Sequence, residues 1–322
     1  MSDAVARLKA QLPEHPSVDE LTPLADDYTG LRILAVHAHP DDESSKGSAS
    51  AAAYTDRGAR YMVATMTGGE RGDILNEEIK HSPRAHRDLP GMRRSEMAAA
   101  AKAIGIEHRW MGFVDSGLPE GDPMPPLPFG CFGVQPLERA AAPLVRLVRE
   151  YRPHVMISDN EIGGYPHPDH MMSHKVAVEA YEKAGDPEAY VGEGQPWAPL
   201  KLYYDRAFNP ERLVAGHEFL MVRDGQSVFS GWVENLVDQV STDGIRHEST
   251  TRIPSSAYFD RRDQAMLAHA SQIDPNGAFF AIPTEDVKKV WPWEDYTLIA
   301  SRVTVDLPEC CLADGLDYKA AG

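Results

Sequence analysis

Residues 31–43 read LRILAVHAHPDDE and combine a predicted strand with a cluster of ionisable side chains. The apolar run Ile33–Val36 is typical of a short buried strand. It leads into His39 and three carboxylic acids, at the end of the strand where α/β proteins place their chemistry. A proline follows His39 and suits the first turn of a helix, in which His39 and Asp42 would lie on one face and reach the same ion. Asp41 would then lie beside the ion without binding it.

Apolar segments alternate with segments of helical spacing from this stretch to residue 184. We expect strands at 60–66, 107–113 and 155–158, and helices at 47–57, 92–104, 137–151 and 169–183. This alternation predicts an α/β fold with a Rossmann-like, mostly parallel sheet and helices on both faces. Beyond residue 184 the alternation fades. Strands are expected at 202–204 and 296–305 and a helix at 256–272, whereas 211–251 has no clear assignment.

Three parts of the chain follow from this pattern. Residues 1–30 are a polar N-terminal extension with one short helix expected at 3–11. Residues 31–184 are the Rossmann-like catalytic core, and residues 185–322 are a C-terminal α+β elaboration. We expect the elaboration to form one structural unit with the core and to complete the substrate site.

Charge and cysteine content exclude several classes of protein. The chain has 32 Lys and Arg against 49 Asp and Glu, a net charge of −17, which argues against binding nucleic acid or an anionic membrane surface. Three cysteines, two of them adjacent, do not form a disulfide framework, so a reducing cytoplasm is expected. We expect neither a membrane span nor a signal peptide, because no apolar run approaches the roughly 20 residues that cross a bilayer.

A second ionisable cluster, GGYPHPDH at residues 163–170, follows the strand predicted at 155–158. Like the first cluster it contains His-Pro-Asp and then a further metal-binding residue type. If the two strands are neighbours in a parallel sheet, His39 and Asp42 converge with one or both of His167 and His170. Two imidazoles and one carboxylate suit a catalytic divalent ion such as Zn²⁺.

The remaining groups of the two clusters suit hydrolysis. A divalent ion lowers the pKa of bound water from about 15.7 to about 7, and Asp41 is the candidate base that takes the proton. His167, if it is not a ligand, is placed to protonate a leaving amine, with Asp169 orienting it. Tyr165 could donate a hydrogen bond to an oxyanion, or it could simply pack beside the glycines.

The other histidines are interpreted as structural or exposed. His37 points near the site or is a satisfied core residue, and His154 and His174 are expected to be structural. Seven others are interpreted as ordinary surface histidines: His15, His81, His86, His108, His217, His247 and His269.

The two motifs, together with TGGERGDILN at 67–76 and HASQIDPNGAFF at 269–280, resemble the LmbE-like (PIG-L) superfamily of zinc-dependent deacetylases. The resemblance covers residues 31 to about 305, whereas the N-terminal extension and 211–251 do not match. It implies zinc binding by three residues, with Fe²⁺ as the alternative metal, and it implies a general base and a general acid. The ligands would be His39, Asp42 and His170, the base Asp41 and the acid His167, with Tyr165 and Asp169 assisting.

The resemblance also implies substrate contacts. Arg93 and Asp115 would hold sugar or inositol hydroxyls, and Glu70 would lie near the substrate. Lys46 is similar to the lysine that separates amidases from deacetylases in this group, although a solvated lysine in a first helical turn is the alternative interpretation.

The function implied is hydrolysis of the amide bond of a small thiol-sugar conjugate. Mycothiol S-conjugates would yield glucosaminyl-inositol and an N-acetyl-cysteine S-conjugate, a detoxification reaction. The nearest alternative is deacetylation of N-acetyl-glucosaminyl-inositol in mycothiol biosynthesis. More distant alternatives are phosphoryl transfer with Mg²⁺ on Asp41 and Asp42, and a sugar-binding module, which would not need the spare groups Asp41 and His167. The sequence leaves a homo-oligomer open.

Overall fold

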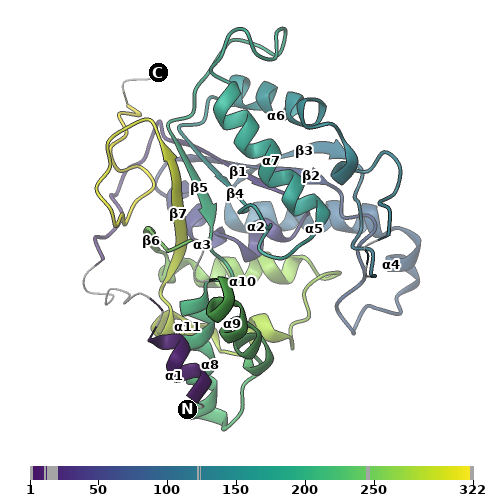
Figure 1. The fold of residues 1–322 in the computed structure, drawn as a ribbon, viewed down its shortest axis with the longest axis vertical. Helices are drawn as coiled ribbons and strands as arrows, with labels where there is room; N and C mark the ends of the chain where they lie inside the picture. The colour runs from purple at the N-terminus through teal and green to yellow at the C-terminus, as the bar shows by residue number, and fades with distance from the viewer. Residues whose placement is uncertain are drawn as a thin grey trace.

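A single seven-stranded sheet forms the centre of the protein in the computed structural model (Figure 1). The structure describes residues 3–10, 12, 21–121, 123, 125–243 and 247–319. The strands lie in the order β3-β2-β1-β4-β5-β7-β6. Their bounds are β1 Arg32–His37, β2 Arg60–Thr67, β3 Glu107–Phe113, β4 Val155–Ser158, β5 Lys201–Asp205, β6 Thr251–Pro254 and β7 Trp293–Ser301. Strands β1 to β5 pair in parallel, and β7 is antiparallel to both β5 and β6.

Helices cover both faces of this sheet, as Figure 1 shows. Their bounds are α1 Asp3–Lys9, α2 Asp42–Ser45, α3 Ser48–Thr55, α4 Pro83–Arg87, α5 Leu89–Ile104, α6 Leu137–Tyr151, α7 Pro168–Lys183, α8 Pro210–Asp224, α9 Ser230–Asp243, α10 Phe259–Ala268 and α11 Thr284–Val290. The predicted fold class, an α/β fold with a mostly parallel sheet, is confirmed.

The two faces follow from the alternation of side chains along β1. Ile33 and Ala35 belong to a core cluster with residues of α3, α5 and α10, and Leu34 and Val36 belong to a second cluster with residues of α6 and α7. Successive side chains of a strand point to opposite faces, so a strand buried on both faces reads as a continuous apolar run. The run Ile33–Val36 therefore marks a central strand.

Element boundaries differ from the sequence prediction in several places. Helix α5 begins at Leu89 rather than at 92, because the carboxylate of Asp88 accepts a hydrogen bond from the Gly91 amide and caps the helix. The helix predicted at 256–272 is shorter, since α10 ends at Ala268 and His269 leaves the helical conformation. The last strand lies at Trp293–Ser301, three residues earlier than expected at its start.

The region that the sequence left unassigned, 211–251, contains α8, α9 and the start of β6. Val5 and Leu8 of α1 pack with Val214 and Val233 in a small separate cluster. Figure 1 shows α1, α8, α9 and α11 gathered at one end of the molecule. Part of the N-terminal extension, including His15, lies outside the described residues.

The described part of the chain contains no helix that is both long and apolar enough to cross a bilayer. Cys131, Cys310 and Cys311 are free thiols.

Candidate active site

Three predicted metal ligands meet where β1 and β4 end. Strands β1 and β4 are paired neighbours, so the segments that follow them leave the sheet side by side. His39 Nδ1 lies 3.2 Å from His170 Nε2. The Asp42 carboxylate lies 3.9 Å from the same His39 nitrogen and 3.7 Å from the same His170 nitrogen. All three side chains are at least nine-tenths buried.

Carboxylates hold the outer nitrogens of both ligand imidazoles. Asp169 Oδ2 lies 3.3 Å from His39 Nε2, and Asp159 Oδ2 lies 3.2 Å from His170 Nδ1. Such partners fix the orientation of an imidazole and raise its basicity as a ligand. The placement of Asp169 differs from the sequence prediction, which assigned its carboxylate to His167. Its carboxylate bonds His39 and Ser116, and only its backbone amide reaches His167, at 3.1 Å from Nδ1.

This donor set fits a divalent ion. The two facing nitrogens cannot both donate to each other, and a cation between them and Asp42 satisfies all three groups. Two imidazoles and one carboxylate with open positions are the ligand chemistry of catalytic zinc sites. Two other groupings of potential ligands exist among the described residues, His39-Asp115-His167-Asp169 and His37-Asp159-Asp205. The Lys46 ammonium donates a hydrogen bond to Asp159, so the second of these groupings already contains a cation.

The Lys46 side chain is only 3% exposed. Its Nζ also lies 3.2 Å from Asp42 Oδ1 and 3.2 Å from His170 Nδ1. Burial opposes the charged form, but Asp159, Asp42 and Asp205 hold the pKa of Lys46 well above its usual value. The interpretation of Lys46 as a solvated lysine is therefore wrong, because it is a buried cation beside Asp42 and His170.

The predicted base, Asp41, is the most open carboxylate of the first motif. Its side chain is 25% exposed, against 8% for Asp42. Its backbone has a φ of 120°, a conformation that costs an L-residue energy and is found at functional sites. Burial raises the pKa of the Asp41 carboxyl, and the nearby Arg93 opposes that rise. Asp41 is thus partly open to solvent while it lies directly before Asp42.

Arg93 holds the loop that carries Asp41. Its guanidinium donates to the carbonyl oxygens of Gly69, at 2.8 Å, and Pro40, at 2.6 Å, and lies 3.5 Å from Asp41 Oδ1. The side chain is 3% exposed. The prediction that Arg93 binds sugar hydroxyls stays a prediction, and the contacts seen here are with the protein.

Asp115 and Glu70 are joined to each other at the end of β3. Glu70 Oε1 accepts a hydrogen bond from the Asp115 amide at 3.0 Å. The Asp115 carboxylate accepts from the amides of Gly117, at 2.7 Å, and Arg71, at 2.9 Å, and lies 3.7 Å from His39 Nε2. Although burial opposes it, His39 keeps the pKa of Asp115 below its usual range. Their predicted role in binding substrate stays a prediction, and in this structure Asp115 supports His39.

His167 and Tyr165 flank the ligands on the side of the second motif. The His167 ring centroid lies 4.6 Å from that of His39, and the Tyr165 ring lies 4.8 Å from that of His170. His167 Nδ1 accepts the Asp169 amide hydrogen, so the neutral ring carries its proton on Nε2. Burial and the neighbouring His39 and His170 lower the pKa of His167 to about 3. Tyr165 is 41% exposed, so part of this residue is open to solvent.

A buried histidine–carboxylate pair that the sequence did not predict lies behind Asp41. His269 Nε2 lies 2.7 Å from Glu43 Oε1, with side chains 0% and 1% exposed, and Glu43 Oε2 accepts the Asp41 amide at 3.0 Å. The interpretation of His269 as a surface histidine is therefore wrong. The third acid of HPDDE was the available signal, since a buried carboxylate needs a partner. The partner of Glu43, His269, lies 226 residues later in the sequence.

This pair predicts a pH dependence of stability. Burial alone would lower the pKa of His269, but Glu43 outweighs it and raises that pKa above 6.5. The stabilisation is therefore present below about pH 6.5 and is lost as the pH rises through the raised pKa. Urea unfolding of metal-free protein between about pH 6 and about pH 9 should show a larger loss of stability in the wild type than in His269→Gln. Equal pH slopes would contradict the pairing, and His86→Gln, which changes an exposed histidine, is the control.

Comparison with known proteins now identifies the family. Residues 34–181 match the family described as GlcNAc-PI de-N-acetylase, or PIG-L. The chain belongs to the PIG-L family.

Two relatives narrow the comparison. The chain is 45% identical over 292 residues to the mycothiol S-conjugate amidase of Streptomyces coelicolor, which covers 90% of this chain and 99% of that protein. It is 36% identical over 281 residues to a 1D-myo-inositol 2-acetamido-2-deoxy-alpha-D-glucopyranoside deacetylase of Streptomyces avermitilis, with 85% and 93% covered. The solved N,N'-diacetylchitobiose deacetylase of Pyrococcus horikoshii has a TM-score of 0.55 at 14% identity, with 83% of each chain covered. That last likeness concerns the fold alone.

Proposed function

We propose that this protein is a zinc-dependent amidase that hydrolyses the amide bond of mycothiol S-conjugates. The products would be glucosaminyl-inositol and an N-acetyl-cysteine S-conjugate, which suits a detoxification enzyme of the cytoplasm. The observation that supports this most is the pair of spare groups, Asp41 and His167, on either side of the ligand set. The relative at 45% identity supports the choice of substrate over that of the deacetylase at 36%.

Each polar group has a role in this proposal. A divalent ion held by His39, Asp42 and His170 would act as a Lewis acid toward the amide carbonyl and lower the pKa of water. Zn²⁺ is the proposed ion and Fe²⁺ the alternative. Asp41 takes the proton of the attacking water, since it is open to the site and held in place by Arg93.

The second motif serves the leaving group. His167 Nε2 faces away from the Asp169 amide and delivers a proton to the departing glucosamine nitrogen. Because the pKa of His167 is lowered to about 3, the ring is neutral at physiological pH and must gain the proton it delivers during the reaction. Tyr165 donates a hydrogen bond to the oxyanion, a contact worth about 3 to 4 kcal/mol.

A rate comparison tests the proposal. Zinc-loaded protein should hydrolyse a mycothiol S-conjugate with a much larger kcat/KM than N-acetyl-glucosaminyl-inositol, and a chelator should abolish both rates. Recovery of both rates when zinc is added back would show that the chelator did not damage the protein. A preference for the acetylated sugar would assign the protein to mycothiol biosynthesis instead.

A further inference from the structure

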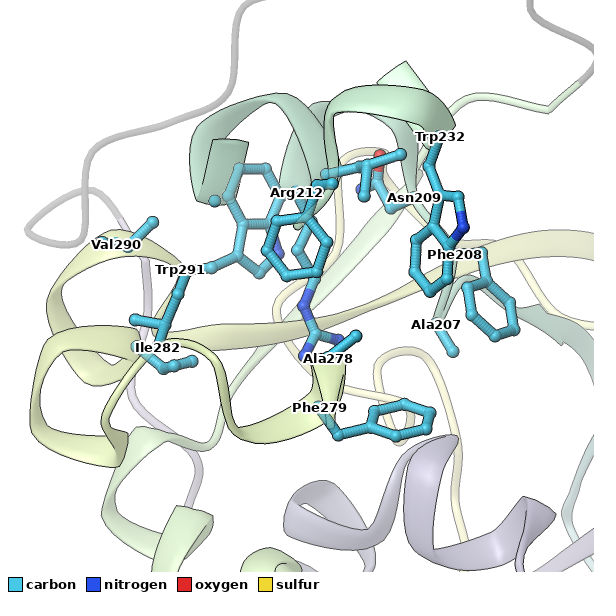
Figure 2. Close-up of a pocket in the computed structure, with 14 residues that line it drawn as sticks. Ala207, Phe208, Asn209, Arg212, Trp232, Ala278, Phe279, Ile282, Val290 and Trp291 are labelled. Carbon is cyan, nitrogen blue, oxygen red and sulfur yellow. The ribbon is translucent and has the colours of Figure 1, made fainter. Parts of the chain in front are cut away.

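An apolar pocket lies in the C-terminal half of the chain, outside the groups used so far (Figure 2). Its volume is about 130 Å³. It is lined by Ala207, Phe208, Asn209, Arg212, Leu213, Gly216, Phe229, Trp232, Ala278, Phe279, Ile282, Val287, Val290 and Trp291. Figure 2 shows Phe208 and Trp232 on one side, Trp291 and Ile282 on the other, and Arg212 extending between them.

Two segments connect this pocket to the reaction centre. The first leaves β5 at Asp205, whose carboxylate groups with Asp159 and His37 within 4.8 Å, and reaches the pocket at Ala207 and Phe208. The second begins at His269, which bonds Glu43 behind the base. It reaches the pocket at residues 278–279. Two of the segments that line the pocket therefore begin next to the proposed active site.

A direct contact joins the pocket to the second motif. A Cβ atom added to Gly164 would lie 3.6 Å from the Phe208 ring, so that ring packs on the glycine beside Tyr165. Tyr165 in turn lies against His170. Phe208 therefore links the lining of the pocket to the motif that carries Tyr165, His167 and His170.

The lining favours an uncharged apolar occupant. Phe208, Trp232 and Phe279 are 50%, 48% and 46% exposed, and burying such surface is favourable by about 25 cal/mol per Å². Among the described lining residues none is acidic and Arg212 is the single charged one. A guanidinium excludes cationic groups and stacks well on aromatic rings.

We propose that this pocket binds the S-substituent of the conjugate and selects an apolar group about the size of one aromatic ring. This inference rests on the proposed function. A dry apolar cavity of about 150 Å³ is known to accept benzene, so the volume here suits a phenyl or benzyl group. Another exposed apolar side chain, Phe129, belongs to a loop outside the pocket and serves as a comparison.

Two substrates and two variants test the pocket. The wild type should hydrolyse the S-benzyl conjugate of mycothiol with a kcat/KM about tenfold or more above that of the S-methyl conjugate. Ala278→Leu fills the pocket and should remove most of this preference while leaving the S-methyl rate within about twofold. Phe129→Ala, which truncates the loop residue, should leave the preference unchanged.

Further measurements separate a failed pocket from a failed function or a failed fold. Hydrolysis of both conjugates at equal efficiency, or a loss of preference in Phe129→Ala, would overturn the pocket and leave the amidase standing. Hydrolysis of neither would overturn the amidase and the pocket with it. Calorimetry should show S-benzyl-N-acetyl-cysteine binding to the wild type more tightly than to Ala278→Leu. If Ala278→Leu unfolds, Phe279→Ala, which opens the rim, should likewise lower the preference.

Discussion

Asp41→Asn should lower kcat by about 10²- to 10⁴-fold, because it removes the proposed general base and keeps the shape of the side chain. Asparagine has nearly the same size and shape as the aspartate that adopts the positive φ of 120° at this position, so the loop should keep its conformation. Metal content should be unchanged, since Asp41 is not among the proposed ligands. Steady-state kinetics on a mycothiol S-conjugate, with zinc content measured on the same sample, checks both parts.

Asp306→Asn is a matched control for this variant, because Asp306 is an exposed aspartate outside the site. It should retain wild-type kinetics. Unchanged turnover in Asp41→Asn would remove Asp41 from the mechanism. Loss of zinc together with turnover would instead indicate that Asp41 is a metal ligand.

His170→Ala should remove both metal and activity. The side chain is 1% exposed and its two nitrogens lie beside His39 and Asp159, so the variant removes one of the two imidazoles of the proposed ligand set. Loss of a Lewis acid that supplies several kcal/mol should lower kcat/KM by about 10³-fold or more. Zinc affinity measured by competition with a chelating dye should fall in parallel.

His86→Ala is the control for this loss, since His86 is exposed and distant in sequence from both motifs. Full zinc binding by a folded His170→Ala protein would show that the ion lies elsewhere. Circular dichroism and thermal unfolding of the two variants would show whether either result comes from misfolding.

The sequence predicts the central fold well because its signals are local. The run Ile33–Val36 is buried on both faces, so it is continuously apolar and marks an interior strand of the sheet. The motif residues directly after β1 and β4 converge because parallel strands present their carboxyl ends at one edge. Topology alone therefore brings His39, Asp42 and His170 together.

Side-chain contacts between residues far apart in the sequence were not predictable in this way. The Asp169 carboxylate bonds His39 rather than His167. The buried Lys46 ammonium bonds Asp159, which directly follows strand β4. His269 reaches Glu43 from the C-terminal half. No local spacing specifies these pairs, because each depends on where two distant segments meet. The apolar pocket, built largely from residues after β5, escaped prediction for the same reason.

The most direct test is the position of the metal itself. Anomalous diffraction at the zinc edge from crystals of the zinc-loaded protein should show one strong peak between His39, Asp42 and His170. Asp41 and His167 should lie next to the peak without binding it. A peak between His37, Asp159 and Asp205, or between Asp115, His167 and Asp169, would contradict the assignment of both the ligands and the spare catalytic groups.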